Sequence, residues 1–265
     1  MNRNTLVGVL LALVCVVLAL LLDHDSFIVL LNPSALILVL GGTSALAFGV
    51  GTLEEAKALP KVVKKALAAS PEDLGATVER LVEMASVSQK SGLLSLEAIA
   101  KSDPDPFLRR GVGLVVNGKD ADTIRELLDA DIAAMAARHH HRAHILKQAG
   151  GFAPTLGIIG TVIGLVHVMS DISSPATLGP AIGAAFTATL WGVLSANIFW
   201  HPLASKLTRL GAAEVEAREA QKEGLLAIQE GERPRGVMAR LASFAPQHST
   251  SQYSTETREV EAGAA

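Results

Sequence analysis

The sequence of 265 residues contains a single cysteine, and aromatic residues make up only 4% of it. With one cysteine, Cys15, the chain cannot form an intrachain disulfide, so a reducing compartment would break no covalent cross-link within it. Charge is missing from two long stretches, because residues 151–170 and 178–203 contain no Asp, Glu, Lys or Arg. A helix needs roughly 20 apolar residues to cross the hydrocarbon core of a bilayer. Both stretches therefore predict membrane spans.

Two further apolar runs stand at the start of the chain, at residues 5–22 and 27–50, with a short polar link between them. A cleaved signal peptide is the competing interpretation of the first run. No small-residue cleavage pattern follows Leu22, however, and another apolar run begins at once, so we expect a retained anchor. The sequence thus predicts an all-α, polytopic membrane protein with four transmembrane helices and a large helical cytoplasmic domain.

The distribution of positive charge predicts the orientation of these spans. Of the 23 Lys and Arg residues, 14 lie in residues 51–150 and 8 in 204–265, and Arg3 precedes the first run. None lies in the short links at residues 23–26 and 171–177. Cytoplasmic segments carry the excess of Lys and Arg, so both termini and residues 51–150 are expected in the cytoplasm.

Apolar residues recur at helical spacing through residues 51–150, with charges on the opposite face. The last of these helices is expected to start at Asp120 or Asp122 and to continue unbroken into the third span. We expect five segments: 1–50, the first two spans with their short periplasmic loop; 51–150, the cytoplasmic helical domain; 151–204, the third and fourth spans; 205–246, C-terminal cytoplasmic helices; and 247–265, a disordered tail.

Small and slightly polar residues form a stripe on each of the last two spans. One interpretation is close packing of the two helices, since small residues let helix backbones approach in lipid. The sharper interpretation is that Thr161 and Thr189 also face a passage for an ion. The stripe of the third span contains Pro154, Gly157, Thr161, Gly164 and Val168, and that of the fourth contains Ala185, Thr189, Gly192 and Ala196.

No apolar run contains a carboxylate, a lysine or an arginine, although an ion path through a membrane normally needs an ionisable or coordinating group. The titrating carboxylate is therefore expected on a partner helix. His167 could act as a proton relay or could simply hydrogen-bond a neighbouring helix. Residues 139–141 are consecutive histidines, and His144 follows them on the same cytoplasmic helix, so a metal site is one interpretation. Three consecutive side chains fan out around a helix and cannot all converge on one ion, which favours a solvated or headgroup-facing cluster. No metal site and no cofactor is expected.

Two prolines and two charges allow more than one interpretation. Pro154 and Pro202 lie near the same face of the membrane, either as punctuation at helix ends or as hinges that transmit an event to the cytoplasmic helices. Lys90 and Glu97 are seven residues apart, which places them on one face of a continuous helix. From the residues alone, they are solvated surface charges.

Several motifs together resemble the MotA/PomA family, the A subunits of the bacterial flagellar stator. The resemblance covers roughly residues 5–246. It rests on Asn32-Pro33-Ser34-Ala35 with Gly41-Gly42-Thr43, on Ser91-Gly92-Leu93-Leu94-Ser95-Leu96-Glu97, on the Gly-Gly-Phe-Ala-Pro-Thr-Leu-Gly run from Gly150, on Trp191-Gly192 through Pro202-Leu203-Ala204, and on Gly224-Leu225-Leu226-Ala227-Ile228-Gln229-Glu230-Gly231.

This resemblance implies a multi-pass protein of the bacterial inner membrane, in which five copies surround two copies of a B subunit. The B subunit's single span carries the Asp that binds the ion, and ion flow turns the ring against the switch complex of the rotor. By position, Lys90 and Glu97 match charges that contact the rotor, Pro154 and Pro202 match the family's two coupling prolines, and Thr161 and Thr189 match hydroxyls near the ion path.

Two residues depart from the family's pattern. Gln89 replaces a second basic residue, which weakens the expected rotor contact. Ala188 replaces a threonine typical of sodium-driven members, so the resemblance favours protons over sodium. The alternatives are an ExbB/TolQ-type energiser of outer-membrane processes and a self-contained channel. Neither an enzymatic activity nor a nucleic-acid partner is expected.

Overall fold

The computed structural model describes residues 32–52, 73–170 and 175–244, together with isolated residues between 7 and 64. Within these ranges all regular structure is helical, which confirms the all-α prediction. The chain divides into two compact units, one formed by residues 1–70 and 138–210 and the other by residues 71–137 and 211–265. We call the first the membrane unit and the second, after the location expected from its charges, the cytoplasmic unit.

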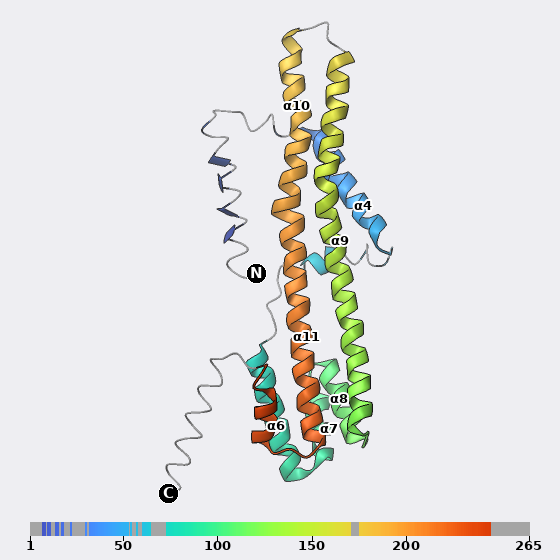
Figure 1. Ribbon diagram of the computed structural model, residues 1–265, viewed down its shortest axis with the longest axis vertical. Helices are drawn as coiled ribbons and strands as arrows, with labels where there is room; N and C mark the ends of the chain where they lie inside the picture. The colour runs from blue at the N-terminus through green and yellow to red at the C-terminus, as the bar shows by residue number, and fades with distance from the viewer. Residues whose placement is uncertain are drawn as a thin grey trace. The chain divides into compact units, whose positions relative to one another are not determined.

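Three helical segments are long and apolar enough to cross a membrane: Pro33–Val50, Ala121–Ser170 and Leu178–Gln229. The first is made of α3 (Pro33–Leu36), a π-helical turn η1 (Ile37–Gly41) and α4 (Gly42–Val50). The others are α9 (Ala121–Ser170) and the continuous run of α10 (Pro175–Leu194), the π-helical turn η3 (Ser195–Trp200) and α11 (His201–Gln229) (Figure 1). The predicted span at residues 5–22 falls mostly outside the described residues.

Local chemistry explains where these helices begin. Asn32 is extended and accepts hydrogen bonds from the backbone N–H groups of the next residues, while Pro33 takes the first helical position, where no N–H is needed. Asp120 caps α9 in the same way, because its carboxylate accepts the backbone N–H of Thr123 at 2.8 Å. That bond lowers the pKa of Asp120. As expected, α9 then continues as one helix of 50 residues.

The core of the membrane unit consists mainly of small residues. Five alanines, including Ala153 and Ala196, pack with Ile145, Leu146 and Trp200. Large side chains of the same helices point outward instead: Ile158, Val162 and Val166 of α9 are all more than half exposed. A unit that buries alanine and exposes isoleucine and valine matches the environment of a lipid bilayer.

The cytoplasmic unit has a core of larger side chains. It contains α6 (Leu74–Ser91), the short 3₁₀ turn η2 (Leu93–Ser95), α7 (Leu96–Ser102), α8 (Pro106–Val116), α12 (Pro234–Leu241), the start of α9 and the end of α11. Its fully buried residues come from all of these helices and include Leu81, Met84, Leu96, Leu108, Leu128, Leu225 and Leu241. This core holds the short helices α6 to α8 against the two long ones.

Candidate functional site

Two threonines form a polar cluster between α9 and α10. The hydroxyl oxygens of Thr161 and Thr189 lie 2.5 Å apart. The Thr161 hydroxyl is also 3.1 Å from the carbonyl oxygen of Ala185, and the carbonyl oxygen of Gly157 lies within reach of both hydroxyls. The cluster thus contains more oxygen acceptors than hydroxyl protons. It can bridge the two helices, and it can offer oxygen lone pairs to water or a cation.

Glycines bring the two helices this close together. A Cβ atom added at Gly157 would lie 2.8 Å from the carbonyl oxygen of Ala188, and one added at Gly192 would lie 2.7 Å from the carbonyl oxygen of Ala153. Real Cβ atoms do not approach backbone oxygens so closely. The small-residue stripes predicted from the sequence therefore form the packing surface between α9 and α10, and the threonine pair lies on it.

Both prolines belong to the region where α9 meets the α10–α11 run. Pro154 lies inside α9, and a Cβ atom on Gly192 would be 3.2 Å from its Cα. Pro202 is the second residue of α11, directly after the π-helical turn η3. The ring of the preceding His201 packs on Gly150, where an added Cβ would meet it at 2.5 Å. Proline and a π-helical turn both loosen the regular backbone ladder of a helix.

Two side chains connect the start of the second span to α10. The amide nitrogen of Asn32 donates to the carbonyl oxygen of Ala184 at 3.1 Å, and the indole nitrogen of Trp191 donates to the carbonyl oxygen of Leu30 at 2.7 Å. A partly open cavity of about 340 Å³ lies beside this connection, lined by Asn32, Ser34 and small residues of α9 and α10. His167 reaches its wall, and no described residue hydrogen-bonds its ring.

The structure corrects the expected arrangement of Lys90 and Glu97. They do not share a helix face, because α6 ends at Ser91 and Gly92 adopts a left-handed φ of 79°. Lys90 lies in the last turn of α6, and Glu97 lies in the first turn of α7. Both are exposed, and Glu97 pairs with Lys101 of its own helix at 2.8 Å. The turn at Gly92 therefore separates the helix that contains Lys90 from the helix that contains Glu97.

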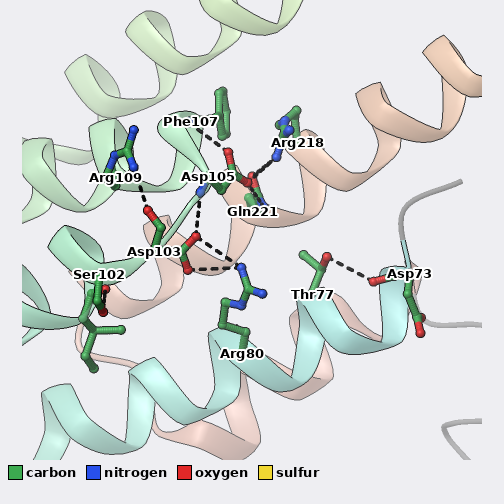
Figure 2. Close-up of polar contacts among 11 residues, drawn as sticks. Asp73, Thr77, Arg80, Ser102, Asp103, Asp105, Phe107, Arg109, Arg218 and Gln221 are labelled. Carbon is green, nitrogen blue, oxygen red and sulfur yellow. Dashed lines mark hydrogen bonds and ion pairs between the residues drawn. The ribbon is translucent and has the colours of Figure 1, made fainter. Parts of the chain in front are cut away.

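A network of charges that the sequence analysis missed fixes the junction between α7 and α8 (Figure 2). Asp103 follows α7 and accepts from the Arg80 guanidinium of α6 at 3.1 Å. Asp105 caps α8 and accepts from both Arg218 and Gln221 of α11. The side chains of Asp105 and Arg218 are at most 13% exposed. The Asp-Pro-Asp-Pro sequence from Asp103 was the available signal, since Asp before Pro is typical of a helix start.

Two cations of the cytoplasmic unit, Lys222 of α11 and Arg240 of α12, each lie among several carboxylates. Burial lowers the pKa of Lys222, but hydrogen bonds to Asp129 and Glu219 raise it more, so the net shift is upward. Arg240 of α12 behaves alike, with Glu230, Glu232 and Glu223 around it. A cation whose pKa is raised by folding stabilises the folded state fully at any pH below the pKa of the same group in the unfolded chain. This stabilisation is lost only when the pH rises through the raised pKa, in strongly alkaline solution. These pairs therefore hold across the whole neutral range.

Residues 99–220 match the family model described as the MotA/TolQ/ExbB proton channel family. The chain is similar to motility protein A of Bacillus subtilis, with 36% identity covering 93% of this chain and 92% of that protein. It is also similar to the chemotaxis protein PomA of Vibrio alginolyticus, with 32% identity covering 92% and 95% of the two chains. A solved structure of the flagellar MotAB stator complex from Bacillus subtilis superimposes with a TM-score of 0.87 at 33% identity, covering 95% of this chain and 99% of that one.

Proposed function

Since this chain belongs to the MotA/PomA family of flagellar stator A subunits, we propose that it couples ion flow across the inner membrane to torque on the flagellar rotor. The observation that carries the proposal is the threonine cluster, which is a polar contact between two helices that contain no Asp, Glu, Lys or Arg within residues 151–170 and 178–203. Such helices can line an ion path but cannot hold a proton on a carboxylate. A B subunit with an Asp in its single span would supply that group.

The proposed assembly follows from the same premise. It contains four spans per chain, with residues 5–22 as the first, both termini in the cytoplasm and five copies around two B subunits. In this arrangement Thr161 and Thr189 lie beside the ion path. Pro154 and Pro202 would couple ion passage to the cytoplasmic helices, because each proline removes a backbone hydrogen-bond donor, Pro154 inside α9 and Pro202 just after the π-helical turn η3. Lys90 and Glu97 would contact the switch complex of the rotor.

We favour protons as the coupling ion. Ala188 is buried, and its side chain faces Gly160, where an added Cβ would lie 2.7 Å away. The larger threonine expected of a sodium-driven member would crowd this contact, so an additional hydroxyl oxygen for sodium has little room. The hydroxyls of Thr161 and Thr189 already hydrogen-bond to each other, which occupies oxygens that sodium would need as ligands. Protons need fewer oxygen ligands than sodium does.

The proposal is tested by deleting the gene for this chain and measuring swimming speed in the complemented strain while sodium is withdrawn at constant proton motive force. We expect the deletion to abolish swimming and the complemented speed to be independent of sodium. Normal swimming in the deletion strain would overturn the assignment to the flagellar motor. A steep sodium dependence would overturn the choice of ion alone.

A further inference from the structure

His167 is the only titratable side chain in the apolar stretches of α9 and α10. Residues 151–170 and 178–200 contain no Asp, Glu, Lys, Arg, Cys or Tyr, and this one histidine. It lies three residues before the end of α9 at Ser170, which faces the periplasm in the proposed topology. Ionisable side chains are rare inside membrane spans and usually serve a function there.

The ring of His167 has no structural partner within the described part of the chain. It is exposed, and no described residue hydrogen-bonds either ring nitrogen. The Ser170 hydroxyl donates only to the backbone carbonyl oxygen of His167, at 2.7 Å. The ring lines the cavity of about 340 Å³ that also contains Asn32 and Ser34 in its wall. Bonding between described helices therefore does not account for this histidine.

The same cavity extends from His167 to the level of the threonine cluster. Its wall along α9 reaches Gly160, seven residues from His167, which is about 10 Å at the helical rise of 1.5 Å per residue. Gly160 directly precedes Thr161. Across the cavity, Ala185 of α10 lines the wall, and its carbonyl oxygen accepts the Thr161 hydroxyl at 3.1 Å. The imidazole and the threonine cluster thus lie toward opposite ends of one cavity.

The cavity has the size and the polar groups that a chain of water molecules needs. Its volume corresponds to about ten waters, at roughly 30 Å³ each in the liquid. Asn32, Ser34 and the imidazole supply polar groups at one end, and none of the lining residues is Asp, Glu, Lys or Arg. Asp171, which follows α9, lies outside the described residues. An imidazole can accept a proton on one nitrogen and release one from the other.

We propose that His167 is a proton relay at the periplasmic entrance of the ion path. One ring nitrogen takes a proton from water on the periplasmic side, and the other nitrogen gives its proton to water inside the cavity, so the ring returns to its neutral form. The proton then passes by the threonine cluster to the carboxylate of the B subunit. This inference rests on the proposed function, with protons as the coupling ion.

The test measures proton flux into vesicles that contain the complete complex with its B subunit, in His167→Gln, His167→Ala and Met169→Ala. We expect His167→Gln to lower the flux by about tenfold or more, because the amide keeps a polar side chain but cannot relay a proton at neutral pH. Met169→Ala is the matched control. Met169 is 66% exposed near the same end of α9, it does not line the cavity, and its truncation should leave the flux unchanged.

Chemical rescue separates a relay from a structural role. Imidazole added outside the vesicles should raise the flux of His167→Ala, because the truncation leaves room for the free base beside the cavity. Pyrazole, a ring of the same size that takes up no proton at neutral pH, should not raise it. Empty vesicles and the wild-type complex with the same imidazole correct for diffusion of the base through lipid.

Each failure has its own signature. Unchanged flux in His167→Gln would overturn the relay and leave the proposed function intact. A loss that imidazole restores no better than pyrazole would also overturn it and assign His167 a role in packing. Should His167→Ala fail to co-purify with the B subunit, His167→Gln decides. Absence of proton flux in the wild-type complex would overturn proton coupling itself, and this inference with it.

Discussion

At the scale of single residues, two glycines determine how closely α9 and α10 can approach each other. Gly157 and Gly192 face backbone atoms of the opposing helix, so neither position has room for a side chain. The threonine pair depends on this approach, because a hydroxyl contact of 2.5 Å is lost once the helix axes separate. Packing and the polar cluster are thus two consequences of the same small residues.

We predict that Gly192→Ala destabilises the membrane unit by about 1–3 kcal/mol, the usual cost of inserting a methyl group into a filled interface. The new Cβ would meet the carbonyl oxygen of Ala153 at 2.7 Å, and that backbone atom cannot move aside cheaply. Thermal melting of the purified complex in detergent measures the change. Gly183→Ala is the matched control in the same helix, because no atom lies within 4 Å of its added Cβ. Equal melting of the two variants would contradict the packing described here.

The charge of Glu97 gives a second prediction at this scale. Glu97→Lys should lower torque at high load without affecting membrane insertion, because a rim charge controls the orientation and rate of docking. The new lysine would also lie beside Lys101 and repel it. Bead assays measure the torque, and a compensating charge reversal on the rotor should restore part of it. Glu126→Lys, an exposed reversal on α9, is the control, and an equal torque loss there would refute a specific role for Glu97.

At the scale of elements, the junction of α7 and α8 connects the exposed turn between α6 and α7 to the long helix α11. Asp103 ties it to α6, and Asp105 ties it to α11 through Arg218 and Gln221 (Figure 2). The helix that carries Glu97 is therefore held by groups of α6 and α11. In the proposed contact with the rotor, force applied at the turn between α6 and α7 would reach α11 through these bonds.

We predict that Asp105→Asn destabilises the cytoplasmic unit by about 1.5–3 kcal/mol, since it removes the charged hydrogen bond between Asp105 and the buried Arg218, which keeps the longer ion pair with Glu214 at 3.6 Å. The carboxamide retains the size of the side chain, so the change isolates the charge. Limited proteolysis and thermal melting of the purified protein report the loss. The control Asp122→Asn removes an ion pair whose carboxylate is 95% exposed, and it should cost less than about 1 kcal/mol. Similar losses in both variants would show that the junction is not held by this pair.

Much of this element structure could be predicted from sequence, because long uncharged runs and helical periodicity leave few alternatives. The continuous α9 and the packing stripes of α9 and α10 are confirmed. Lys90 and Glu97 were wrongly placed on one helix, although Lys90 in a last turn before Gly92 is a typical helix end. The contacts of Asp105 with Arg218 and Gln221 could not be predicted, because they join residues 113 and 116 positions apart.

At the scale of the whole molecule, the chain divides its chemistry between two units. The membrane unit supplies hydroxyls, small residues and prolines, while the cytoplasmic unit supplies charges held by buried ion pairs. Neither of the uncharged stretches of α9 and of the α10–α11 run contains an acid that could carry a proton. The account therefore requires a second subunit for ion transport, and this chain alone should be unable to conduct.

The most direct measurement is cation flux into vesicles that contain either the purified chain alone or the complex with its B subunit. A pH-sensitive dye trapped inside the vesicles reports proton entry under an imposed membrane potential. We predict flux above that of empty vesicles only with the B subunit present, and its loss when the B subunit's intramembrane Asp is replaced by Asn. Flux through the chain alone at the rate of the full complex would contradict the central claim.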